Sequence, residues 1–111
     1  MDVKSNPLII ARKFLKDQEE NVRNGKKQKI TLLNELCQKV AGFRLEYEEE
    51  SLYLPSDNLT LWVVKVKLYH NLSLVNLAAV THNSKQESKN ISTVLIIDSI
   101  LSIAIPEGGK V

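Results

Sequence analysis

The residues that could do chemistry are few and scattered. His70 and His82 each stand at a strand end or in a loop, and no H-x-x-x-H pair, Cys-His cluster, Gly-x-Ser-x-Gly elbow or phosphate-binding glycine loop accompanies them. The adjacent carboxylates Glu48 to Glu50 fall in an expected exposed turn, where nothing would shift their pKa values apart for acid and base roles. We therefore expect a protein that is not an enzyme and that needs no cofactor, metal or small-molecule ligand.

Cys37 is the only cysteine, so the chain cannot form an internal disulfide, which is typical of a reducing compartment. No His or second Cys lies near it in the sequence. Its place in a helical apolar pattern indicates a small buried side chain rather than a reactive thiol.

Lys65 and Lys67 share one face of an expected strand with Tyr69, which gives two cations and one ring. This pattern fits a small barrel that binds single-stranded nucleic acid, but a solvent-facing lysine row on an antiparallel sheet is the commoner explanation. The formal net charge of +2 is too small to argue for sequence-independent nucleic-acid binding. Nucleic-acid binding is therefore the alternative function.

Two helices are expected before residue 43. Ser5 and Asn6 before Pro7 form a helix start, and apolar residues then recur at near-helical spacing until a stop or kink at Asn24-Gly25. A second apolar stripe occupies residues 30–41, and Gly42 stands where a left-handed cap would end it.

From Phe43 the apolar period changes to two, as a half-buried strand requires. Residues 61–69 form the strongest expected strand, and residues 72–81 continue in extended character. Residues 82–90 are polar and predict a surface loop, whereas 91–97 and 100–105 are β-branched runs that predict two further strands. The expected order is two helices and then about five strands.

A chain of 111 residues has room for one hydrophobic core, and its 43% hydrophobic content is ordinary for a soluble globular protein. No segment approaches the ~20 apolar residues that a bilayer span needs, and no signal peptide is visible. We expect a protein of the cytoplasm, the nucleus or both, without a membrane partner.

Residues 30–106 resemble the Sm and LSm family in pattern. Residues 68–75, LYHNLSLV, look like the family's first motif, and residues 93–103, TVLIIDSILSI, look like its second motif. The resemblance implies an α+β fold, with N-terminal helices followed by a five-stranded, strongly bent antiparallel Sm-like sheet or barrel. It divides the chain into an N-terminal helical extension (1–29), an Sm-like domain (30–106) and a flexible tail (107–111).

The departures from the family fall on its RNA-contacting residues. Ser73 stands where an Asn is expected, and Ile97-Asp98 stand where an Arg-Gly pair is expected. Each lost charge-assisted contact would cost about 1.5 to 3 kcal/mol, so direct RNA binding should be weak or absent. This profile is similar to the Sm-like Gemin subunits of the survival-of-motor-neuron (SMN) complex, which implies a role in spliceosomal snRNP assembly and hence in mRNA splicing.

In the Sm family, the fifth strand of one subunit pairs with the fourth strand of its neighbour. The resemblance therefore implies a heterodimer with another Sm-like subunit, joined through the β-branched residues of the two late strands. These expected partner-binding residues are Ile91, Val94, Ile96, Ile100, Ile103 and Ile105.

The first helix offers a second expected surface, because its apolar residues spread over two rows. One row could bind a helical scaffold subunit, or the whole helix could cap the open end of the sheet. The residues considered for partner binding are Leu8, Ile10, Phe14 and Leu15.

Overall fold

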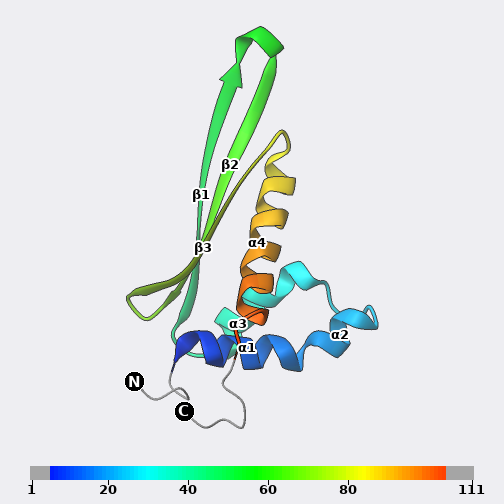
Figure 1. The fold of residues 1–111 in the computed structure, drawn as a ribbon, viewed down its shortest axis with the longest axis vertical. Helices are drawn as coiled ribbons and strands as arrows, with labels where there is room; N and C mark the ends of the chain where they lie inside the picture. Colours follow the sequence, from blue (N-terminus) through cyan, green and yellow to red (C-terminus); the bar gives the residue numbers. More distant parts are fainter. Residues whose placement is uncertain (1–5, 105–111) are drawn as a thin grey trace.

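Helices flank a three-stranded antiparallel sheet in this protein (Figure 1). The structure, a computed structural model, describes residues 6–104. The elements follow one another as α1 (Pro7–Asp17), α2 (Glu19–Arg23), the 3-10 turn η2 (Lys29–Thr31), α3 (Leu32–Lys39), β1 (Phe43–Leu54), the 3-10 turn η3 (Pro55–Asp57), β2 (Leu59–His70), β3 (Ser73–His82) and α4 (Lys85–Leu101).

The first helix begins at Pro7 as the sequence predicts, but it is interrupted at Gln18, so that residues 7–23 form α1 and α2. The predicted helix over residues 30–41 is the turn η2 followed by α3, which ends at Lys39.

The Asn6 side chain accepts a hydrogen bond from the backbone N–H of Leu8 at 2.9 Å, which caps α1, while Ser5 lies outside the described residues. Gly42 follows α3 with φ +94°, and a Cβ at this position would meet the His70 ring at 2.9 Å. Both the backbone angle and the close approach therefore require glycine before the chain enters β1.

The sheet is a simple meander in the order β1-β2-β3. β1 pairs with β2 along its whole length, whereas β3 pairs only with Trp62–His70. The end of the β1–β2 hairpin, residues 52–61, consequently projects past β3 and past α4 (Figure 1). The expected acidic turn at Glu48 to Glu50 is wrong, because β1 runs through these residues without a break and ends at Leu54.

The two faces of the sheet have different environments. Val64, Val66 and Leu68 point toward the helices and are fully buried. α4 packs on β2 and β3 alike, and α3 packs on β1. Lys65 and Lys67 point to the opposite face, which is not covered by any element of residues 6–104. The alternation predicted for β2 is therefore confirmed.

The predicted five-stranded sheet is wrong, because the sheet has three strands and residues 85–101 form the helix α4. The expected loop at 82–90 is also wrong, since α4 begins within it. Ser84 caps the helix by accepting a hydrogen bond from the backbone N–H of Glu87 at 3.2 Å. Tertiary packing overrides the β-propensity of the isoleucines, because one side of α4 is buried against the sheet.

One core joins the helices to the sheet, and residues from both sides of position 30 contribute to it. Ala11 and Leu15 of α1 lie in the same buried cluster as Leu33, Val66 and Ile97. The N-terminal helical extension thus shares a core with the sheet and does not stand apart from it. No helix within residues 6–104 has both the length and the apolar composition that crossing a bilayer requires.

Replacing Ile97 by Ala should test whether this part of α4 belongs to the core. Ile97 is fully buried, so we expect the free energy of unfolding in urea to fall by about 2 to 5 kcal/mol. Leu72→Ala is the control, because Leu72 is 96% exposed and its loss should change stability by less than about 0.5 kcal/mol. Equal effects of the two substitutions would contradict the burial of α4.

Candidate functional site

The residues considered for catalysis do not form one cluster, and each of them has a packing or hydrogen-bonding role in the fold. The His70 ring packs against Phe43, with 4.8 Å between ring centroids. The His82 ring nitrogen Nδ1 accepts a hydrogen bond from the backbone N–H of Ser84 at 3.0 Å, just before α4. Cys37 is half-buried against the core, and burial raises the pKa of its thiol. Within residues 6–104, no three His, Cys, Asp or Glu side chains gather as a metal would require.

The lysine row on β2 lies beside carboxylates of β1. Lys67 donates a hydrogen bond to Glu48 and forms an ion pair with it. This hydrogen bond holds the pKa of Glu48 below its usual range and raises the pKa of Lys67. Tyr69 is covered by the guanidinium of Arg44, 4.5 Å from the ring centroid. Lys67 and the ring of Tyr69, two of the three side chains considered for nucleic-acid binding, therefore already have partners within the sheet.

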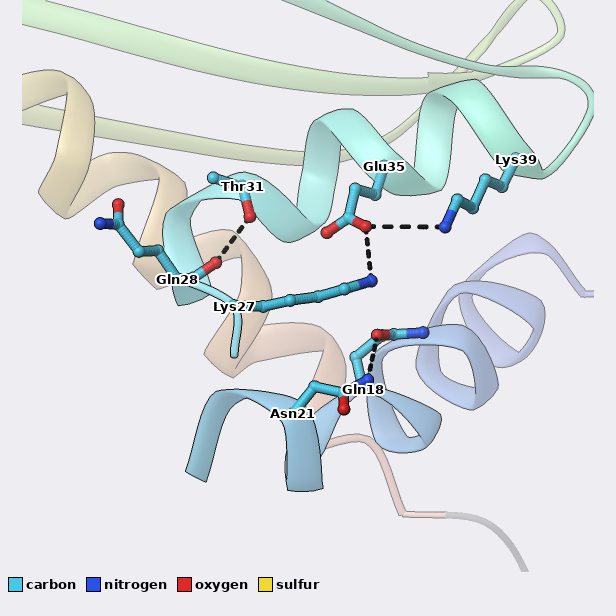
Figure 2. Close-up of polar contacts among 7 residues, drawn as sticks. All are labelled: Gln18, Asn21, Lys27, Gln28, Thr31, Glu35 and Lys39. Carbon is cyan, nitrogen blue, oxygen red and sulfur yellow. Dashed lines mark hydrogen bonds and ion pairs between the residues drawn. The ribbon is translucent and has the colours of Figure 1, made fainter. Parts of the chain in front are cut away.

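Glu35 organises the polar contacts between the N-terminal helices (Figure 2). Its carboxylate accepts a hydrogen bond from Lys27 at 2.7 Å and lies 3.7 Å from the ammonium of Lys39. The hydrogen bond from Lys27 is the main reason why the pKa of Glu35 lies below its usual value. The network fixes the connection between α2 and α3, which is a structural role.

A shallow apolar groove lies between α1 and the end of α3. Its lining consists of Ile9, Ile10, Lys13, Phe14, Asp17 and Val40. Ile10 and Phe14, which the sequence singles out for partner binding, therefore reach this groove. Leu8 packs partly buried against the core, and Leu15 is fully buried within it. The side chain of Leu15 is consequently not accessible to a partner.

The residues expected on late partner-binding strands lie on α4 or after it. Ile96 and Ile100 are buried in the core, whereas Ile91 is 38% exposed and Val94 is half-buried. Ile103 follows the helix and packs against the core. Ile105 lies outside the described residues. No strand edge exists at these positions in the described part of the chain, so an edge contact through them is wrong.

The sheet nevertheless has two edges, and their compositions differ sharply. β1 carries Arg44 and the carboxylates of Glu46, Glu48, Glu49 and Glu50. Charges on an edge strand oppose pairing with another chain. β3 has ten residues, none of which is Lys, Arg, Asp or Glu. Among residues 6–104 no strand pairs with its second edge.

Exposed apolar side chains gather around β3. The described residues include eight large hydrophobic side chains that are exposed, and five of these lie on β3, in the turn before it or on α4. These five are Leu72, Leu74, Leu77, Ile91 and Leu95. The remaining three lie on the projecting hairpin. A strand with no charge and apolar neighbours on both faces has the composition of a central strand, although β3 stands at an edge.

The helix α4 contributes to this surface through one row of side chains. Ile91, Leu95 and Ser99 are spaced by four residues, so they lie along one side of the helix. Ser99 accepts a weak hydrogen bond from the Asn76 side chain of β3 at 3.5 Å, which places this row beside β3. We call β3 together with Ile91 and Leu95 the β3 edge surface.

The interpretation of the sequence missed the β3 edge surface. A signal for it was present, because no Lys, Arg, Asp or Glu occurs between Lys67 and Lys85. Knowing that this stretch contains an edge strand requires the sheet order, which depends on α4 being a helix.

In comparisons with known proteins, no family model matches the chain, and neither the curated proteins nor the solved structures contain a significant match.

The Glu35 network should make stability depend on pH in a predictable direction. Because the pKa of Glu35 is below 4.5 in the folded state, the ionised form adds stability that is complete above about pH 4.5 and is lost as pH falls through the lower folded pKa. In Glu35→Gln, we expect a lower free energy of unfolding at neutral pH and a shrinking difference from wild type below pH 4.5. Glu50→Gln is the control at an exposed site, and a pH-independent difference for Glu35→Gln would contradict the role of its charge.

Proposed function

We propose that this protein is a non-catalytic assembly subunit, which binds a protein partner by adding a strand to the edge of β3 that no strand within residues 6–104 occupies. The observation that carries the proposal is the contrast between the two edges of one sheet. The β1 edge has five charged residues, and the β3 edge has none. Charge is one of the devices with which proteins protect an edge strand, so an edge without charge is suited to pairing outside the irregularity that the register shift at Leu68 and Tyr69 marks at the start of β3.

The backbone of β3 supplies the binding groups. About half of the N–H and C=O groups in a strand point away from its neighbour, so β3 offers backbone donors and acceptors along an edge that no strand within residues 6–104 occupies. One backbone N–H of β3, that of Leu77, also donates a hydrogen bond to the Asn76 side chain at 2.8 Å, which a partner strand would have to replace or leave in place. A partner strand would satisfy these groups, and its side chains would meet Leu74 and Leu77, each 49% exposed. Backbone pairing would give affinity, and the apolar side chains would favour an apolar partner strand.

An Sm-like partner and a place in snRNP assembly remain predictions that come from the sequence resemblance. The fourth and fifth strands that join Sm subunits do not occur within residues 6–104, so the joint proposed here is a different strand. Binding of single-stranded nucleic acid has less support. The five-stranded barrel on which it relied is not formed, and Lys67 is paired with Glu48.

Site-specific photo-cross-linking in cells tests the proposal. A benzoylphenylalanine probe replaces Leu77 on β3 in one variant and Leu52 on β1 in the other. The two positions form a matched pair, because their exposures are 49% and 51%. We expect a discrete protein adduct from position 77 and little from position 52. Equal adducts, or none from position 77, would contradict assembly through β3.

A further inference from the structure

We infer that the partner of the β3 edge surface is a second copy of this chain, and that the two copies form a symmetric dimer by antiparallel β3–β3 pairing. The inference rests on the proposed function and names its partner. In such a dimer the two three-stranded sheets would join into one six-stranded sheet. Both α4 helices would then lie on the same face.

The position of α4 over the sheet fits a second copy. α4 packs on β2 and β3 alike, so its axis lies near the midline between these two strands. With strands about 4.8 Å apart, pairing β3 with its copy places the two midlines about 9.6 Å apart. Packed helices have axes about 8 to 10 Å apart. Strand pairing would therefore bring the two α4 helices to packing distance without any movement of either chain.

The side chains that would lie at the two-fold axis of this dimer, Leu95 and Ala78, have sizes that allow the two copies to pack. α4 returns antiparallel to β3, and Ser99 contacts Asn76. Leu95 is one helical turn from Ser99, about 6 Å along α4, and Ala78 is two residues from Asn76, about 6.6 Å along β3. Leu95 therefore lies near the level of Ala78, in the middle of β3. A two-fold axis at Ala78 would bring the two Leu95 side chains together above two small alanines.

A two-fold axis at Ala78 also sets compatible residues of the two β3 strands opposite one another. Antiparallel pairing about Ala78 sets Leu77 of one copy opposite Ala79 of the other, on the uncovered face. No charged residue of β3 would face its own copy, because β3 contains none. Pairing through β1 instead would set one run of glutamates against another. The two-fold arrangement is the commonest way in which identical chains assemble.

Sedimentation equilibrium of the purified protein tests the dimer. We expect wild type to have the mass of two 12.5 kDa chains at micromolar concentration. Leu95→Lys should weaken dimerisation at least tenfold, because it sets two like charges at the two-fold axis. Leu52→Lys is the matched control, since Leu52 is 51% exposed and Leu95 is 47% exposed. We expect Leu52→Lys to dimerise like wild type.

Because a lysine at position 95 could disturb folding, a cross-linking measurement with cysteine at this position provides a second test of the dimer. In a Cys37→Ala background, Leu95→Cys should give covalent dimers with a short bis-maleimide, and Leu52→Cys should not. A wild-type monomer at all concentrations, or equal cross-linking from positions 95 and 52, would overturn the inference.

The two proposals can fail separately. If the purified protein is monomeric but position 77 still forms an adduct with a different protein in cells, the second copy is wrong and assembly through β3 stands. If position 77 forms no more adduct than position 52, both proposals are wrong.

Discussion

The packing of α4 on the β2–β3 half of the sheet is the interaction on which the rest of the structure depends. It buries Ile96, Ile97 and Ile100 in the same core as the apolar side of β2 and as α1. Small polar residues allow α4 to approach the strands closely, because Ser88 donates a hydrogen bond to the backbone carbonyl of Trp62 at 2.9 Å. Within residues 6–104, α4 and the other helices thereby cover one face of the sheet. β3 is left as an uncharged edge, with one row of α4 beside it.

Three features of the first 70 residues could be predicted from the sequence because their signals are local. Asn6 before Pro7 caps a helix, Gly42 adopts a positive φ, and the alternation around Val66 sets one face of β2 inward. The C-terminal region could not be predicted in the same way. The isoleucines between 91 and 105 indicate strands when only side-chain type is considered.

The buried residues of α4 recur at helical spacing, but several of them are polar. The helix could therefore not be recognised from the apolar residues alone. Ser88 and Ser92 face the sheet together with Ile96, and the hydroxyl of Ser92 donates to the Ser88 carbonyl at 2.7 Å. A pattern of apolar residues alone omits these serines. Asp98, which replaces an expected glycine of the Sm pattern, forms an ion pair with Lys29 and links α4 to η2. The β3 edge surface was missed as a consequence. With two further strands expected after residue 90, β3 was not recognised as an edge strand.

Amide hydrogen exchange of the purified protein, at high concentration and after dilution, tests most directly whether β3 is the strand that pairs. If it is, amides throughout β3 should exchange slowly at high concentration, and about half of them should become fast on dilution because their partners are on the other chain. The amides of β1 that point away from β2 should exchange fast at both concentrations. β3 amides that exchange as fast as these at every concentration would contradict pairing through β3.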